Sequence, residues 1–384
     1  MKNLTILYNE EDSKLSDYAV KNSETEERFY PEPPHYYRLP LHRDRDRIFH
    51  SRAFKRLEYK TQVFINSEGD NFRTRLTHTL EVAGISRTIS TALGLNSNLS
   101  EVISLAHDLG HTPFGHMGQD ILSELMKDYG GFEHNKQSLR IVRSLENRYP
   151  EFPGLNLCRA TLVGLLKHGA DYEKSELLIM RQDSGPSVEA IICDFSDEIA
   201  YTHHDIEDGF ERKLISPESL KSCKLWNKHY QEALEVFGHL HEDLIIRKAL
   251  RSMMNEVITD LIENTEKNLF RMNIMNRKNF SESFKAGERP INYSDEIFNG
   301  VVQLKTYLRE NLYLHEEVLS KSKWGQKIIE FLFNYLLKNP SLIPENFRKR
   351  SQQEGIHRSI SDYISGMTDR YAELKAREYG FLDS

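Results

Sequence analysis

The segment from His107 to His116, with the sequence HDLGHTPFGH, gathers three histidines and one aspartate into a single short stretch. The turn-forming residues Gly110, Pro113 and Gly115 lie among them, so several of these side chains can converge on one point. Imidazole nitrogens and carboxylate oxygens bind divalent cations, and histidine also exchanges protons near neutral pH. The segment therefore predicts a metal site with acid/base groups beside it.

Two helices are predicted to carry the first of these groups. Apolar residues at 82, 85, 89 and 93 recur at helical intervals, and His78 lies one turn before them, which predicts His78 on the buried side. A second helix has Ser100 as a plausible N-cap, an apolar run between 102 and 106, and Gly110 near its end. This arrangement predicts that His107 and Asp108 lie in the last turn.

A third helix is expected to start near Pro186 and to run through VEAIICDFSDEIAYTHHDIEDGF. Its core candidates are Ile192, Phe195, Ile199, Ile206 and Phe210. Asp197, Tyr201 and Asp205 fall at i, i+4 and i+8, so two carboxylates and an aromatic hydroxyl share one stripe of this helix. Such a stripe could line a pocket.

Each of these features also has an ordinary structural explanation. A single histidine on an apolar face is most often a hydrogen-bonded core residue, and an acidic stripe is most often solvated. The combination of His78, His107 with Asp108, and Asp197 is what favours a metal site. Two imidazoles and two carboxylates suit Mn, Fe or Mg better than a structural zinc.

Composition limits the class of protein. The 384 residues are 39% hydrophobic and 28% charged with a net charge of -7, which argues against general adhesion to nucleic acid or membranes. The three cysteines show no CxxC spacing, and no apolar run reaches the length of a membrane span. These features predict an enzyme of the reducing cytoplasm.

Two regions are expected along the chain. Residues 1–40 are polar and contain four prolines, which predicts an irregular N-terminal arm. Residues 41–384 are interpreted as one helical domain, with a core at about 60–215 and a C-terminal helical part at about 216–384. In that part, packed helices or subunit interfaces are indicated by apolar residues at helical spacing, namely Leu250, Met254, Val257, Leu261, Val301, Leu304 and Leu308.

The order H...HD...D, together with RLTHTLEV (75–82), HDLGHTPFGHMG (107–118), GFEHNKQS (131–138) and DEIAYTHHD (197–205), resembles the HD-domain deoxynucleoside triphosphate triphosphohydrolases. Three further blocks, at 45–64, 307–318 and 362–372, resemble the bacterial branch, so most of residues 40–375 is covered. The resemblance implies an all-α HD-domain helical phosphohydrolase fold with additional C-terminal helices. It also implies hydrolysis of a dNTP to a deoxynucleoside and inorganic triphosphate.

The resemblance assigns roles to individual residues. The implied ligands of a divalent metal ion (Mn, Mg or Fe) are His78, His107, Asp108 and Asp197. His116 matches the general acid, with His111 and His134 as neighbouring groups that bind or orient phosphate, although the latter two could instead cap a helix end or brace a loop. The implied substrate contacts are Gln62 and Asp205 to the sugar 3'-hydroxyl, Tyr201 where a 2'-hydroxyl would project, and Arg75 to phosphate.

The chain departs from the family three residues after His116. Many relatives carry Glu or Asp there, whereas this chain has Gln119, which can hold an imidazole but cannot stabilise its charged form. Glu133, beside His134, is a candidate substitute. Further cations for a triphosphate could come from the cluster Arg43, Arg45, Arg47, Arg52, Lys55 and Arg56.

Several partners and alternatives stay open at this point. The resemblance implies a homo-oligomer that is dimer-based and in some relatives hexameric, with weak binding of single-stranded DNA or of regulatory nucleotides, to which His357 and Arg358 match only loosely. No membrane partner is expected. The alternative functions are another HD-type reaction, by a nucleotidase or phosphodiesterase, and a nucleotide- or DNA-binding sensor whose catalysis has decayed.

Overall fold

The computed structural model of the chain describes residues 2–62, 73–166 and 185–382. Within these ranges the architecture is all-α, and β contacts are limited to isolated bridges such as that between Thr61 and Thr74. The all-α fold predicted from the sequence is thus confirmed. Two residues of the 45–64 block, Val63 and Phe64, lie outside the described ranges.

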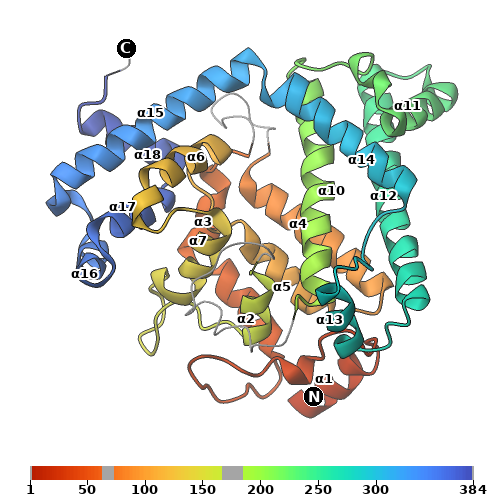
Figure 1. Cartoon of the computed structure of the whole chain (residues 1–384), viewed down its shortest axis with the longest axis horizontal. Helices are drawn as coiled ribbons and strands as arrows, with labels where there is room; N and C mark the ends of the chain where they lie inside the picture. Colours follow the sequence, from red (N-terminus) through yellow and green to blue (C-terminus); the bar gives the residue numbers. More distant parts are fainter. Residues whose placement is uncertain (1, 63–72, 167–184, 383–384) are drawn as a thin grey trace.

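Three helices form the centre of the molecule, namely α4 (Arg75–Ala92), α5 (Ser97–His107) and α10 (Val188–Glu211). Each packs against the other two, and Figure 1 shows α10 in green running beside α4 in orange. Every one of them begins at a residue whose side chain accepts a backbone N–H of the first turn: Thr74, Asn96 and Ser187. The apolar faces of these three helices point into the core of the molecule. The polar residues near the helix ends are therefore held at fixed positions.

The predicted start of α5 was wrong by one turn. Asn96 is the N-cap, whereas Ser100 lies inside the helix, fully buried, with its hydroxyl 2.6 Å from that of Ser90. Asparagine caps as well as serine does, so the helix takes the earlier cap and gains four residues. The end of α5 is at His107 with Asp108 as C-cap, as the predicted last turn required.

The N-terminal residues are more ordered than expected. Residues 4–12 form α1 (Leu4–Asp12), which was not predicted, and the Asp12 carboxylate accepts the backbone N–H groups of Asn22 and Ser23. Further along, Val20 donates its N–H to Glu189 of α10, and Arg28 forms an ion pair of 2.6 Å with Asp44 of α2 (Pro40–Phe49). These contacts tie the arm to the central helices.

A first group of C-terminal helices covers the outer side of α10. It comprises α11 (Lys224–Phe237), α12 (Glu242–Arg271), α13 (Arg277–Lys285) and α14 (Asp295–Leu308). Trp226 is fully buried among them, and the predicted apolar positions of α12 and α14 are buried except for Met254, which is partly buried. These faces therefore pack within the chain.

A second C-terminal group consists of α15 (Glu316–Lys338), α16 (Glu345–Glu354), α17 (Ile356–Ser365) and α18 (Asp369–Glu378). It shares a separate apolar core with α6 (Gly115–Leu125), built around Leu122, Phe333 and Ile364. Figure 1 shows α15 in blue crossing over α6. The shorter helices are α3 (Arg52–Arg56), α7 (His134–Arg140) and α8 (Arg159–Gly164), and π-helical turns lie at Ile141–Leu145 and Arg309–Tyr313.

Single 3-10 turns complete the described chain, at Asn22–Glu24, Leu57–Tyr59, Lys127–Tyr129, Ser219–Ser222 and Pro340–Leu342. None of the helices in the described ranges has the length and apolar character needed to cross a membrane.

Candidate metal centre and surrounding pocket

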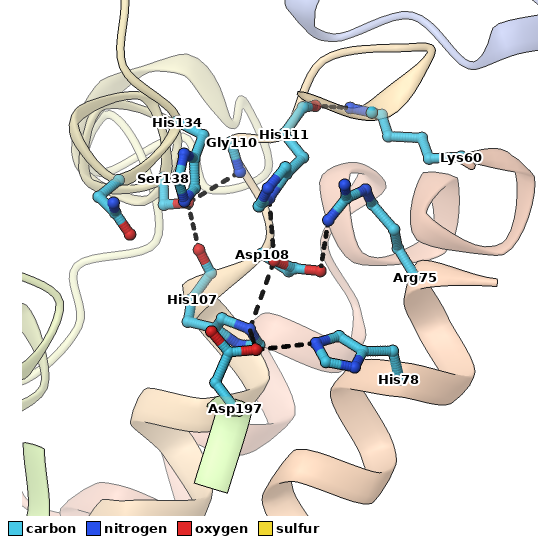
Figure 2. Close-up of polar contacts among 12 residues, drawn as sticks. Lys60, Arg75, His78, His107, Asp108, Gly110, His111, His134, Ser138 and Asp197 are labelled. Atoms are coloured by element: carbon cyan, nitrogen blue, oxygen red, sulfur yellow. Dashed lines mark hydrogen bonds and ion pairs between the residues drawn. The ribbon is translucent and has the colours of Figure 1, made fainter. Parts of the chain in front are cut away.

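Three helices bring two histidines and one aspartate together. His78 comes from the first turn of α4, His107 is the last residue of α5, and Asp197 lies in the middle of α10. One ligand atom from each lies within 4.8 Å of the others, and Figure 2 shows the three side chains pointing toward one another. His78 is 1% exposed and its Nε2 lies 3.0 Å from Asp197 Oδ1, so the predicted buried orientation of His78 is confirmed.

The ring of His107 is oriented for a ligand. Its Nδ1 lies 2.6 Å from the backbone oxygen of Ser104, which places a proton on Nδ1 and leaves the Nε2 lone pair toward Asp197, 3.6 Å away. That Nε2 is buried and has no hydrogen-bond partner among the described residues. A buried nitrogen of this kind, beside a carboxylate and a second imidazole, fits a divalent cation.

Strong electrostatic coupling joins these groups. Burial by itself lowers the pKa of His107, but the charges of Asp108 and Asp197 outweigh burial and raise that pKa to about 9. Burial also works against ionisation of Asp197, but the neighbouring imidazoles of His107 and His78 hold its pKa well below the usual range. The site thus concentrates negative charge that either protons or a cation must balance.

Asp108, the fourth predicted ligand, lies beside this group rather than within it. Its Oδ1 is 3.3 Å from His107 Nε2 and 2.9 Å from His111 Nδ1, and its Oδ2 accepts from Arg75 at 3.0 Å. Burial raises the pKa of Asp108, but His111, His107 and Arg75 outweigh it and keep the pKa far below the usual range. Asp108 therefore links the three-residue group to Arg75 and His111 (Figure 2).

Gly110 permits the close approach of the next helix. A Cβ added there would lie 2.1 Å from the backbone oxygen of His134 and 2.3 Å from the backbone nitrogen of Ser138. Ser138 uses the contact, since its hydroxyl accepts from Gly110 N–H at 2.8 Å and donates to His107 O at 2.7 Å. Gly110 thus brings α7, and His134 with it, against the turn that follows α5.

The three predicted acid/base histidines are neighbours. The ring centroid of His111 lies 4.1 Å from that of His134 and 6.0 Å from that of His116. Burial and then the charge of Arg75 push the pKa of His111 well below 6.5. His116 is the most solvent-exposed of the three, and its pKa is lowered as well, first by desolvation of its ring and then by Arg75.

Gln119 contacts a different histidine from the one predicted. Its Oε1 accepts from the backbone N–H of His134 at 3.1 Å and lies 2.6 Å from His134 Nδ1, so the expectation that position 119 supports His116 was wrong. The reason is that Gly110, which lacks a side chain, lets α7 approach closely. This approach places the start of α7 over Gln119. Glu133 caps α7 by accepting from Asn135 and Lys136, and it also lies 3.1 Å from His134 Nδ1.

The predicted substrate contacts leave buried polar atoms without partners in the described part of the chain. These atoms are Arg75 Nε and Nη2, Gln62 Oε1 and Asp205 Oδ1. Arg75 is 1% exposed, and Nη1 is the one nitrogen of its guanidinium group with a partner among the described residues, Asp108. Unsatisfied buried groups of this kind are stabilised by a polar ligand.

Tyr201 and Asp205 share the face of α10 that carries Asp197. Burial raises the pKa of Tyr201, and Lys305 of α14 lies 6.0 Å from its ring while forming an ion pair of 2.6 Å with Glu198. The Asp205 carboxylate is buried and accepts from the hydroxyl of Tyr313. Sequence analysis did not single out Lys305 or Tyr313, although Tyr313 lies within the block YLRENLYLHEEV.

Three arginines of the predicted basic cluster form structural contacts. Arg43 and Arg47 form ion pairs with Glu32 at 2.9 and 2.7 Å, and Arg45 lies 3.5 Å from Glu101. Arg47 also donates to two backbone oxygens near Asn156. These three arginines therefore anchor the N-terminal arm and α5.

His357 and Arg358 of α17 pack against a turn. The His357 ring stacks on Tyr129 at a centroid distance of 3.5 Å, and Arg358 donates to the backbone oxygens of Tyr129 and Gly131. They hold the connection between α6 and α7.

Comparison with known proteins agrees with this architecture. Residues 75–202 match the HD domain, and residues 291–378 match the phosphohydrolase-associated domain. The fold and the His-His-Asp group therefore define a metal-dependent HD-domain phosphohydrolase.

Whole-chain relatives narrow this class. The chain is 54% identical to a deoxyguanosinetriphosphate triphosphohydrolase-like protein of Leptospira interrogans, with 96% of each chain covered. Proteins of the same description from Azoarcus and Ralstonia pickettii are 46% and 43% identical, with 95% and 96% of this chain and 96% and 95% of theirs covered. The chain belongs to the deoxyguanosinetriphosphate triphosphohydrolase-like family.

Proposed function

We propose that the protein hydrolyses deoxynucleoside triphosphates to a deoxynucleoside and inorganic triphosphate, with a bound divalent cation. The observation that carries the proposal is the His78, His107 and Asp197 group, found in a chain that is 54% identical to a relative described as deoxyguanosinetriphosphate triphosphohydrolase-like. The unpartnered guanidinium nitrogens of Arg75 support an anionic group in the substrate, and the unpartnered oxygens of Gln62 and Asp205 support a hydroxyl group.

For the cation we propose His78, His107, Asp108 and Asp197 as ligands and Mn, Mg or Fe as the metal. The fixed tautomer of His107 and the short distance from its Nε2 to Asp108 Oδ1 support this set. When bound, the cation polarises a water molecule and offsets phosphate charge.

Phosphate recognition is assigned to Arg75, His111 and His134. Arg75 is held by Asp108, so its remaining nitrogens are fixed in direction and can donate to phosphate oxygens without further ordering. Gln119 accepts from the backbone N–H of His134 and contacts its ring, which keeps that ring beside His111. Together these side chains would hold the α-phosphate for attack.

The leaving oxygen, O5', requires a proton, and we assign the role of proton donor to His116. A water oxygen forms a bond to the α-phosphorus, the bond from that phosphorus to O5' breaks, and O5' takes a proton from the His116 imidazolium. The lowered pKa of His116 makes its protonated form a stronger acid. The attacking water releases one proton to solvent, and His116 regains one from solvent, so the protons balance.

Selection of the sugar is assigned to the stripe on α10 and to Gln62. Asp205 and Gln62 would hold the 3'-hydroxyl, and their unpartnered oxygens would be left unsatisfied by a substrate that lacks it. Tyr201 would occupy the space of a 2'-hydroxyl and thereby disfavour ribonucleotides.

The wider setting proposed is a cytoplasmic, dimer-based homo-oligomer, as large as a hexamer, which binds single-stranded DNA or regulatory nucleotides weakly.

The test is incubation with each dNTP and rNTP plus Mn or Mg, followed by chromatography of the products. Deoxynucleoside and tripolyphosphate in equal amounts are expected, with no turnover by Asp197→Ala. Orthophosphate or pyrophosphate would indicate a different HD-type reaction. Intact dNTPs combined with tight, salt-sensitive DNA binding would indicate a sensor.

A further inference from the structure

Asp369, the first residue of α18, contacts two segments that lead to residues near the candidate metal centre. It is 4% exposed, and both of its carboxylate oxygens are used. Oδ2 accepts the backbone N–H of Thr61 at 2.9 Å and also the Thr61 hydroxyl, and Oδ1 accepts the backbone N–H of Phe114 at 3.0 Å. One side chain thus joins two segments that are far apart in the sequence.

The first segment leads to Gln62. Thr61 is the residue before Gln62 and bridges to Thr74, the N-cap of the helix that carries Arg75 and His78. The backbone oxygen of Gln62 lies 3.4 Å from the position of a Cβ built on Gly115, so the two segments are in contact. The position of Thr61 therefore determines where Gln62 meets the turn before His116.

The second segment leads to His116. Phe114 has φ 62° and ψ 28°, a left-handed conformation that is unfavourable for a residue with a Cβ. Gly115 follows with φ 63°, and these two residues turn the chain into α6, whose second residue is His116. A carboxylate that accepts the Phe114 N–H stabilises this turn. It thereby sets the position from which the His116 side chain extends.

Lys60 reinforces the same junction. It is 1% exposed, and its ammonium group donates to the backbone oxygens of His111 and of Ser365, the latter at 2.8 Å. Lys60 thereby ties the other end of the 111–116 turn to the end of α17.

We propose that Asp369 is a positioning residue for the pocket, which sets Gln62 and His116 relative to each other through Thr61 and Phe114. The roles of Gln62 and His116 rest on the proposed function, whereas the contacts of Asp369 do not. A carboxylate suits the task because three donors converge on two oxygens, and the amide of asparagine would place an N–H group against at least one of them.

The test compares Asp369→Asn with Glu345→Gln, which also removes a carboxylate from the first position of a C-terminal helix but lies exposed and paired only with Lys349. For Asp369→Asn we expect kcat to fall by at least about tenfold, because His116 is misplaced. We also expect a smaller preference for a dNTP over the corresponding dideoxynucleotide, because Gln62 is misplaced. Mn affinity should stay within about twofold, since the His78, His107 and Asp197 group is not touched. Glu345→Gln should change none of these.

Amide hydrogen exchange provides a measurement that needs no turnover. Exchange at Thr61 and Phe114 should speed up in Asp369→Asn and stay unchanged in Glu345→Gln. If the parent protein hydrolyses no dNTP, the proposed function fails, while this exchange still tests the positioning. Should Asp369→Asn not fold, Thr61→Val, which removes only the hydroxyl donor, is expected to lower the 3'-hydroxyl preference in the same direction.

Two results would overturn the proposal. The first is a folded Asp369→Asn protein with unchanged kcat and unchanged 3'-hydroxyl preference. The second is loss of Mn affinity in parallel with loss of kcat, which would mean that Asp369 supports folding of the whole site rather than the two segments.

Discussion

Replacing Asp205 with asparagine is expected to change how the stability of the protein depends on pH. Asp205 is buried on α10, and burial is the main reason why its pKa rises from 3.8 to about 7. The hydrogen bond from Tyr313 lowers that pKa, the charge of Asp208 raises it, and the more weakly acting Arg73 and Arg75 lower it. Its Oδ1 lacks a partner in the described part of the chain, which agrees with a carboxyl group that is poorly solvated.

Proton linkage determines whether ionisation of Asp205 raises or lowers the free energy of unfolding. The folded protein holds the Asp205 proton up to a higher pH than the unfolded chain does, so ionisation destabilises the fold as pH rises from 3.8 to about 7. Over the range from about pH 5 to about pH 8 this single group should remove roughly 2–3 kcal/mol from the free energy of unfolding. Asparagine cannot ionise, so Asp205→Asn removes this dependence.

The assay is urea unfolding of the parent and of Asp205→Asn, in the absence of nucleotide, at several pH values. The free energy of unfolding of the variant minus that of the parent isolates Asp205, and this difference should rise by roughly 2–3 kcal/mol between about pH 5 and about pH 8. Asp295→Asn at the exposed start of α14 controls for loss of a carboxylate. A difference that stays flat, or that falls as pH rises, would refute the reasoning about burial of Asp205.

Three further predictions concern the metal group and its surroundings. Asp197→Asn removes the carboxylate that both imidazoles face, so Mn affinity measured by calorimetry should drop by at least roughly a hundredfold, and an unchanged affinity would exclude Asp197 as a ligand. Gln119→Glu replaces an amide oxygen 2.6 Å from His134 Nδ1 with a charge, so NMR titration should find a higher His134 pKa than in the parent, with no rise counting against the contact. Gly110→Ala places a Cβ 2.1 Å from a backbone oxygen, so thermal unfolding should report a loss of several kcal/mol of stability. The control Gly84→Ala, on the open face of α4, should be neutral or stabilising. Equal effects of the two substitutions would contradict the close approach of α7.

Local patterns were enough to predict the three helices and the placement of His78, His107 and Asp197 on them. His78 follows from apolar spacing along α4, and the face shared by Asp197, Tyr201 and Asp205 follows from helical periodicity alone. Helix starts were less certain, because Asn96 and Ser100 are both capable caps and only the packed structure decides between them.

Contacts between distant segments were not predictable from those patterns. Gln119 faces His134 because a glycine lets α7 approach, and no spacing between positions 119 and 134 indicates this. Asp369, Lys60 and Tyr313 act on the pocket through contacts that join the C-terminal helices to the HD domain. Such contacts depend on how helices pack, which periodicity within one helix does not specify.

The central claim is that water attacks the α-phosphorus of a dNTP and that O5' leaves. Hydrolysis in water enriched in heavy oxygen, followed by mass spectrometry of both products, tests it directly. We expect one labelled oxygen in the tripolyphosphate and none in the deoxynucleoside. Label in the deoxynucleoside, or label in orthophosphate or pyrophosphate instead of tripolyphosphate, would contradict it.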